Sequence, residues 1–220
     1  MADGVSTGLG VQMSLRPPKA LSSSQHARWE RILKAAVQLL IERDYEQIQM
    51  RQVAEASEVA LATLYRYFPS KEQLYASAMV AWGDSFDTKV RAQSRTANTD
   101  AARLRSALHR TIKAYERSPN FYRLTATLEV AADPAAREVF YSYTERFFRL
   151  LADVLEDTNE QDAKTAVLVS VSVLGALLRR WSLGELPVRR VYEQIDETVS
   201  LIFGQPRQRT SKVTPAASAR

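Results

Sequence analysis

The residue types that most often carry catalysis or bind metals are scarce in this sequence of 220 residues. It contains no cysteine and two histidines, His26 and His109. Ser106 occupies the position three residues before His109, where a di-iron helix motif has a glutamate. No nucleophile elbow, phosphate-binding loop or dinucleotide fingerprint is present. The sequence therefore predicts no catalytic residue, no metal site and no cofactor, and it predicts that the protein is not an enzyme.

A second group of chemically useful side chains lies between Arg51 and Tyr75. Apolar residues in this stretch follow the i, i+3, i+4 spacing of two short helices, with Val53 on the first and Leu64 and Phe68 on the second. The connection between the two helices is about four residues long. This arrangement is typical of a helix-turn-helix, whose second helix lies in the major groove of DNA. The stretch therefore predicts a DNA-binding unit.

The second of these helices and the residues after it also resemble a known family. The segment reads Thr63-Leu64-Tyr65-Arg66-Tyr67-Phe68-Pro69-Ser70-Lys71-Glu72-Gln73-Leu74. With three aromatic residues followed directly by Pro-Ser-Lys-Glu, it is similar to the TetR family of bacterial one-component repressors. Glu58, Ala60 and Ala62 depart from the family pattern, which more often has glycine, a hydroxyl residue and glycine at these places. A non-glycine residue at position 58 can still adopt the left-handed backbone conformation, at some cost.

The resemblance implies a role for each residue that would contact DNA. Arg51 matches a residue that can reach a guanine edge, which its two-pronged guanidinium suits. Leu61 and Ala62 stand at the start of the reading helix, where they can touch thymine methyl groups, and Thr63 can hydrogen-bond a base or a phosphate. Tyr65, Arg66, Tyr67 and Lys71 are the implied phosphate contacts. Met50 replaces a residue that often carries a hydroxyl group, and Leu64 and Phe68 are expected in the core.

Apolar periodicity and turn signals predict nine helices and no strand. The first helix begins near Ser22, where Gln25 completes a capping box. The next two helices lie at about 51–57 and 61–68, and the fourth runs from Ser70 past Phe86 as a rod that leaves the DNA-binding unit. Two further capping boxes are predicted, Ser70 with Gln73 and Thr158 with Gln161. Residues 169–173 alternate as a strand would, but the cap before them and Gly184 after them favour a helix.

The predicted fold class is therefore all-α, a nine-helix architecture similar to that of the TetR family. Residues 24–70 are the predicted helix-turn-helix domain, and 71–204 are the predicted ligand-binding and dimerisation domain. Residues 1–23 and 205–220 are expected to be disordered, because they are rich in Gly, Ser, Pro or Thr and lack a helical period. The net charge of +5 arises mainly in 205–220, which holds four basic and no acidic residues. Net charge therefore does not by itself indicate DNA binding.

The N-terminus lacks the basic start and apolar core of a secretory signal, which predicts a cytoplasmic protein. The longest apolar stretch, 166–178, is shorter than a membrane-spanning helix, so no membrane partner is expected. Because it is apolar nearly all round, it must be buried on several sides. Together with the stripe in 188–202, it predicts a homodimer. The predicted interface residues are Val167, Val171, Leu174, Leu178, Val191, Ile195, Val199 and Ile202.

Aromatic residues are dense in the predicted fourth to eighth helices. Such a set, accompanied by a few hydroxyl groups, fits an apolar cavity for a small molecule. The predicted ligand-binding residues are Trp82, Phe86, Leu108, Ile112, Tyr115, Phe121, Leu124, Leu128, Phe140, Tyr143, Phe147 and Trp181.

These features predict a homodimeric repressor that binds a palindromic operator in double-stranded DNA and is released by an apolar small molecule. Gln49-Met50-Arg51 and the segment 64–71 most resemble actinobacterial repressors of steroid catabolism, which implies a steroid-derived or acyl-CoA inducer. Two alternatives stay open, a helix-turn-helix protein without a ligand and an α-helical enzyme. A cavity after residue 70 would argue against the first alternative, and a buried, converging pair of ionisable groups would support the second.

Overall fold

The computed structural model describes residues 22–94 and 97–204, and the side chains of these residues except 85–94. The described part is all-α, as predicted, with nine α-helices, one short 3-10 helix and no strand. The helices are α1 (Ser23–Glu42), α2 (Met50–Ala56), α3 (Leu61–Tyr67), α4 (Lys71–Ser94), α5 (Asp100–Arg117), α6 (Pro119–Glu129), α7 (Pro134–Asp153), α8 (Glu160–Ser182) and α9 (Val188–Phe203), and the 3-10 helix is η1 (Tyr45–Gln47).

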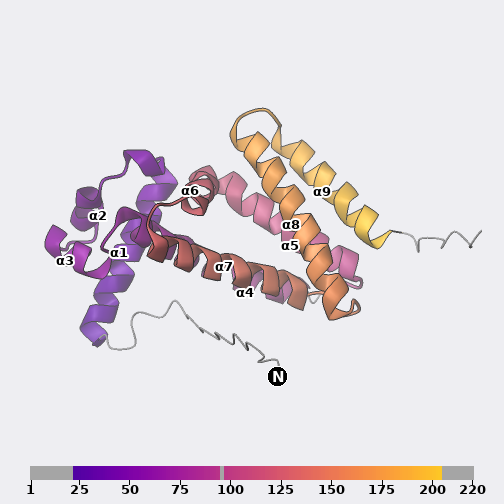
Figure 1. Ribbon diagram of the computed structural model, residues 1–220, viewed down its shortest axis with the longest axis horizontal. Coiled ribbons are helices and arrows are strands. Elements are labelled where there is room, and N and C mark those ends of the chain that lie inside the picture. Colours follow the sequence, from indigo (N-terminus) through magenta and orange to yellow (C-terminus); the bar gives the residue numbers. More distant parts are fainter. Residues whose placement is uncertain (1–21, 95–96, 205–220) are drawn as a thin grey trace, which may run out of the picture.

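The helices form two ends joined by a pair of long rods. Helices α1, α2 and α3 cluster at one end, and α5, α8 and α9 pack together at the other (Figure 1). Helices α4 and α7 run side by side between the two ends, and α6 lies across α1, α5 and α7. The helix that directly follows the helix-turn-helix therefore crosses the molecule, as the sequence predicted.

Two apolar clusters make up the core. The first joins α1–α3 to the first half of α4, to α6 and to the start of α7. The second joins α5, the end of α7, α8 and α9. Leu74, Tyr75 and Met79 of α4 are fully buried in the first cluster, so this cluster continues across residue 70. A division into domains at that residue stays a prediction.

The predicted capping boxes have different outcomes. At α1 the box is confirmed, because Ser22 Oγ accepts the Gln25 N–H and Gln25 Oε1 accepts the Ser22 N–H at 2.8 Å. At α4 only half of the box forms, because the Gln73 amide reaches Asp133 of the α7 cap instead, at 2.8 Å. The box at Thr158 was wrong. Asn159 caps α8 by accepting the Asp162 N–H, and the Thr158 hydroxyl donates to the buried carboxylate of Asp100.

Helix α8 meets the length and hydropathy criteria for a membrane span, the one helix to do so in the described chain. The apolar stretch 166–178 is part of this longer helix, so its length alone does not exclude a span, and the absence of a membrane partner stays a prediction. One such helix is weak evidence for a span, because the core helix of a globular protein passes the same test. Here Val167, Leu174 and Leu178 are buried in the second cluster.

The α8 and α9 residues predicted to form the dimer interface face inward. Six of the eight predicted residues are at most 2% exposed within the single chain, because α8 and α9 pack on each other and on α5 and α7. These six are Val167, Leu174, Leu178, Val191, Ile195 and Val199. Val171 and Ile202 are half-buried. The outer face of α8 is open in the single chain, where Leu168 is 55% and Val169 is 43% exposed.

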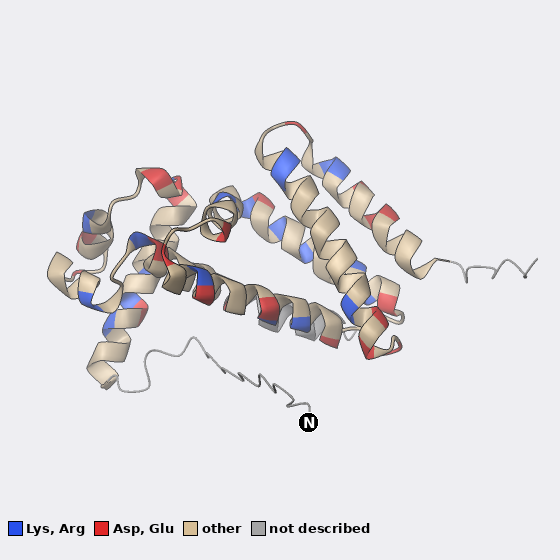
Figure 2. Cartoon of the chain, viewed as in Figure 1, with Lys and Arg blue, Asp and Glu red and all other residues tan. Residues whose placement is uncertain are grey.

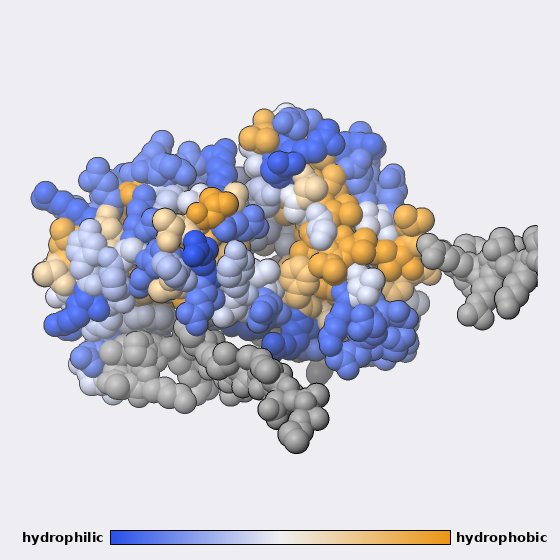
Figure 3. Space-filling model, viewed as in Figure 1, coloured by the Kyte–Doolittle hydropathy of each residue, from blue (hydrophilic) through white to orange (hydrophobic). Residues whose placement is uncertain are grey.

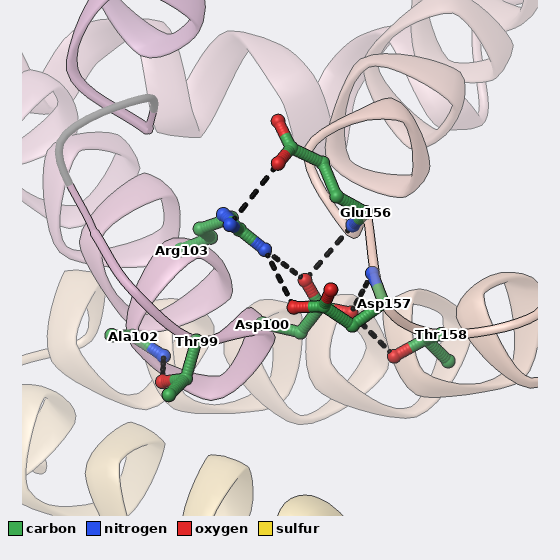
Figure 4. Close-up of polar contacts among 7 residues, drawn as sticks. All are labelled: Thr99, Asp100, Ala102, Arg103, Glu156, Asp157 and Thr158. Atoms are coloured by element: carbon green, nitrogen blue, oxygen red, sulfur yellow. Dashed lines mark hydrogen bonds and ion pairs between the residues drawn. The ribbon is translucent and has the colours of Figure 1, made fainter.

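A buried carboxylate ties the start of α5 to the connection between α7 and α8. Asp100 is 5% exposed and accepts hydrogen bonds from Arg103, from the backbone N–H groups of Glu156 and Asp157, and from the Thr158 hydroxyl, at 2.6–3.0 Å (Figure 4). Burial opposes ionisation, but these donors outweigh it and hold the pKa of Asp100 below its ordinary value.

Asp100→Asn is expected to lower the free energy of unfolding by about 2–4 kcal/mol at pH 7, because several donors lose a charged acceptor. The folded-state pKa is depressed, so the stabilisation is present above the unfolded pKa of about 4 and is lost as the pH falls through the folded pKa. Urea unfolding at pH 7 and at about pH 3 measures the free energy of unfolding of the wild type and of the Asp100→Asn variant. The difference between these free energies should be smaller at pH 3 than at pH 7.

Glu156→Gln is the matched control for this experiment. Its carboxylate contacts Arg103 at 3.1 Å but is 59% exposed, so water screens the pair. An effect as large as that of Asp100→Asn, or an Asp100→Asn effect independent of pH, would contradict the assignment.

Candidate nucleic-acid interface and ligand cavity

The turn between α2 and α3 has a non-glycine residue, Glu58, at the position with a positive φ. Glu58 has a positive φ of 54°, the only non-glycine residue with this property in the described ranges. The N–H groups of Glu58 and Val59 cap the end of α2 by bonding the carbonyls of Glu55 and Ala54. The Ser57 hydroxyl also donates to Val53 at 2.6 Å. The α2 end of the turn is thus capped despite the departures from the family pattern.

Helix α3 presents one face to the core and the other to solvent. Leu64 is fully buried and Phe68 nearly so, as predicted. Leu61 is 40% and Tyr65 45% exposed, Ala62 and Arg66 are also exposed, and Thr63 is half-buried. The exposed face therefore combines apolar groups, a hydroxyl and a cation, which are the groups that touch base edges and phosphates in a major groove.

Arg51 of α2 lies on the surface beside this helix. Its side chain is 78% exposed and pairs with Glu55 at 2.9 Å. Such an exposed pair contributes little to stability, so the guanidinium can exchange this partner for another at small cost. The helix-turn-helix end carries side chains of both signs (Figure 2), so DNA recognition depends on the placement of single cations.

Two of the predicted phosphate contacts point elsewhere. The Lys71 ammonium donates to the Tyr45 carbonyl at 2.5 Å and lies 4.0 Å from the centre of the Tyr45 ring. Burial lowers the pKa of Lys71, although Glu46 and Glu72 oppose this. The Tyr67 hydroxyl is buried, and its ring packs on the first apolar cluster. In this arrangement Lys71 joins η1 to α4, and neither residue offers its polar group to solvent as Arg66 does.

A cavity of about 480 Å³ lies among α4, α5, α6, α7 and α8, the helices predicted to hold a ligand. Five predicted residues line it: Trp82, Tyr115, Phe140, Tyr143 and Phe147. Leu108, Ile112, Phe121, Leu124 and Leu128 are fully buried in the core behind the wall, Trp181 packs on the second cluster, and the side chain of Phe86 lies outside the described part. The sequence-based residue list omitted lining residues such as Thr111, Tyr122, Thr125, Thr144, Phe148 and Arg179, and placed Val171, Leu174 and Leu178 at the dimer interface instead.

The cavity wall is mostly apolar, and four of its hydroxyl groups already donate to the protein. Tyr122 donates to the Gly175 carbonyl at 2.8 Å, and Thr111, Thr125 and Thr144 donate to carbonyls of their own helices. Burial, with the charge of Glu129, raises the pKa of Tyr122 to about 12, so the phenol stays neutral. Two charged residues, Glu129 and Arg179, line the cavity, and both are exposed.

Helix α4 lines the cavity with Trp82, and the next residue, Gly83, lies against Tyr143 of the cavity wall. The Trp82 ring lies on the cavity wall and stacks on Phe121, with 4.5 Å between ring centres. Gly83 allows the Tyr143 ring of α7 to lie against the α4 backbone, because a Cβ atom at this position would lie 2.6 Å from the Tyr143 hydroxyl oxygen. A side chain of the cavity wall therefore touches the rod that leads to α3.

Hydrogen bonds also connect the cavity helices to the helix-turn-helix end. Asp133, the cap of α7, accepts from Ser70 and Gln73 at the start of α4. In α6, the Asn120 amide donates to the Leu40 carbonyl of α1 at 3.0 Å, and Arg123 pairs with Asp44. Four polar contacts thus join α6 and the cap of α7 to α1, to Asp44 just after it and to the start of α4.

An exposed reading helix joined by a rod to an apolar cavity defines a one-component DNA-binding regulator. A family model described as "Bacterial regulatory proteins, tetR family" matches residues 32–78. A transcriptional repressor named KstR from Rhodococcus jostii is 30% identical over 86% of this chain and 88% of its own length. KstR from Mycolicibacterium smegmatis is 32% identical over 85% and 92%. The chain belongs to the TetR family of bacterial regulatory proteins, and it is a regulator and not an enzyme.

Solved structures share this fold. A TetR transcriptional regulator from Rhodococcus sp. RHA1 superposes with a TM-score of 0.67 at 26% identity, over 82% of this chain and 98% of that one. Two transcriptional regulators named FadR are 16% identical and show the fold alone. The Bacillus subtilis protein, solved with stearoyl-CoA, has a TM-score of 0.61 over 80% and 98%. The Thermus thermophilus protein, solved with lauroyl-CoA, has a TM-score of 0.65 over 87% and 100%.

Proposed function

We propose that the protein is a cytoplasmic homodimeric repressor that binds a near-palindromic operator and releases it when an apolar molecule enters the cavity. The observation that carries the proposal is the cavity of about 480 Å³, walled by the helix that leads to α3. A DNA-binding protein without a ligand has no need of such a cavity. The cavity also lacks a buried pair of ionisable groups, since Glu129 and Arg179 are exposed, which argues against a catalytic site.

In this proposal residues 24–70 recognise DNA and residues 71–204 bind the ligand and the partner subunit. Arg51, Leu61, Ala62 and Thr63 contact bases, and Tyr65 and Arg66 contact phosphates. Tyr67 and Lys71 position these residues from behind, because their polar groups are directed into the protein.

The ligand proposed is an apolar molecule with a polar or anionic end. The walls are rich in aromatic side chains and four of the hydroxyl groups already donate to the protein, so an apolar body fits them best. Arg179 can pair with a carboxylate or a phosphate. A steroid-derived acid and an acyl-CoA both meet this description, in agreement with the sequence resemblance to repressors of steroid catabolism and with the ligands named for the two FadR structures.

The DNA half of the proposal is tested by selection from a random duplex library at a stated salt concentration. Arg51→Ala is expected to relax the preference for one base pair in each half-site by about 1–3 kcal/mol, because a bidentate contact to a base is lost. Arg66→Ala should weaken binding to all sequences alike. It should also make the DNA affinity less dependent on salt, by the amount expected from the loss of about one phosphate contact. If Arg66→Ala changes the preferred sequence and Arg51→Ala does not, the assignment of roles is wrong.

The ligand half is tested by adding candidate molecules to the complex with the selected operator. A steroid-derived acid or an acyl-CoA should release the DNA at a concentration that also raises the Tm of the free protein. A coupling of roughly 1–3 kcal/mol would reduce the DNA affinity by about 5- to 150-fold. If ligands stabilise the protein without changing DNA affinity, the cavity does not control DNA binding.

A further inference from the structure

A second hollow adjoins the cavity on the side away from Arg179. Its volume is about 910 Å³, and it lies between the second half of α7 and the first half of α8. Thr144 and Phe148 line both this groove and the cavity. The two volumes are therefore neighbours, with these two side chains between them.

The groove has an apolar floor and a charged rim. Phe148, Ala152, Leu155, Ala163 and Val167 form the floor. The rim residues carry both signs: Glu145, Arg149, Asp153, Glu160 and Lys164. Lys164 is already paired with Glu160 at 2.5 Å. Because the charges lie at the rim and are mixed in sign, the floor favours hydrocarbon over a charged group.

The cavity and the groove follow the same helix. Arg179 of α8 lines the cavity and Lys164 of α8 lines the groove. At a rise of 1.5 Å per residue, these positions are about 22 Å apart along the axis. A ligand that uses both volumes is therefore elongated.

We propose that the cavity and the groove form one binding site for a long-chain acyl compound, in which Phe148 sets the length of chain that is accepted. The proposal rests on the proposed function and specifies its ligand. The anionic end lies near Arg179, and the end of the chain passes Phe148 to reach the groove. A flexible hydrocarbon chain can bend past the Phe148 ring to reach the groove. A rigid fused-ring ligand could extend from the cavity into the groove only if that ring were absent. The passage therefore favours a hydrocarbon chain.

The test compares lauroyl-CoA and stearoyl-CoA, whose chains differ by six methylene groups, by isothermal titration of the full chain. Stearoyl-CoA is expected to bind wild type at least ten times more tightly, because the additional methylenes are removed from water in the groove. Phe148→Trp should narrow the connection between the cavity and the groove and reduce this preference to about twofold or less.

A second variant blocks the groove without touching the cavity. Ala152 lines the groove alone, so Ala152→Phe should also remove the preference for the longer chain while lauroyl-CoA binding is retained. Circular dichroism and the Tm establish that each variant is folded. If wild type prefers stearoyl-CoA and neither variant changes the preference, the chain does not enter the groove and the inference is overturned.

The proposed function fails in a different way. If wild type binds neither thioester but a steroid-derived acid releases the operator, the repressor proposal holds and the acyl-chain inference is overturned. If no such ligand affects DNA binding, the proposed function itself fails.

Discussion

Leu168→Arg is expected to give a monomer that binds the operator at least a hundredfold more weakly than the wild-type protein. Leu168 is 55% exposed on α8, and it shares one face with Ser172 and Ala176, which are also exposed and line the cavity. Apolar side chains gather over α8 and the end of α9 on this side of the molecule (Figure 3). In the proposed dimer a partner covers this face, and a charge buried there without a partner opposes association.

The loss of DNA affinity follows from the loss of the second reading helix. Two linked helices bind two half-sites with an avidity that exceeds the single affinity by about 10²–10⁴. Sedimentation velocity measures the oligomeric state, and titration of the selected operator measures the affinity. The matched control is Tyr141→Arg, because Tyr141 is 51% exposed on α7, away from the α8 face. A Leu168→Arg protein that sediments as wild type would refute this choice of face.

Gly83→Ala is expected to destabilise the protein by about 1–3 kcal/mol and to remove the response to inducer. The new methyl group would overlap the Tyr143 ring, so α4 and α7 must separate or the ring must turn into the cavity. In either case the contact that joins the cavity wall to the rod is lost. Thermal unfolding measures the destabilisation, and operator release by the inducer measures the response.

The double variant Gly83→Ala, Tyr143→Leu separates packing from signalling. Removing the ring makes room for the methyl group, so the double variant should be more stable than the sum of the single effects predicts. It should still fail to release DNA, because Tyr143 is the side chain that carries the contact. Normal release by the double variant would show that the signal travels elsewhere, with the α6 and Asp133 contacts as the next routes to test.

Local patterns in the sequence determined the order and type of the helices and the face of α3 that packs inside. The spacing of Leu64 and Phe68, the cap at Ser22 and the break at Gly184 act over a few residues, so they could be read without knowledge of distant contacts. The aromatic residues of 82–147 include five that line the cavity, Trp82, Tyr115, Phe140, Tyr143 and Phe147.

Only the tertiary structure decided which partner each side chain meets. Thr158 and Gln73 had the right spacing for capping boxes, but carboxylates from distant helices, Asp100 and Asp133, took their hydrogen bonds. The apolar stripe of α8 was visible in the sequence, yet periodicity alone does not say whether a stripe faces its own core or a partner. Val167 and Leu174 turned out to pack inside.

Gly83 and Gly175, which both lie inside long helices, show that the sequence alone does not say which contacts a residue makes. Gly83 and Gly175 each interrupt a long helix at a similar cost in helix propensity. A Cβ atom at Gly83 would overlap Tyr143, whereas a Cβ atom at Gly175 would meet nothing within 4 Å in the single chain. The sequence determined that both positions are flexible and small. The packing of α7 against α4 determined that Gly83 is needed for a contact with the cavity wall, because that contact depends on a residue sixty positions away in the chain.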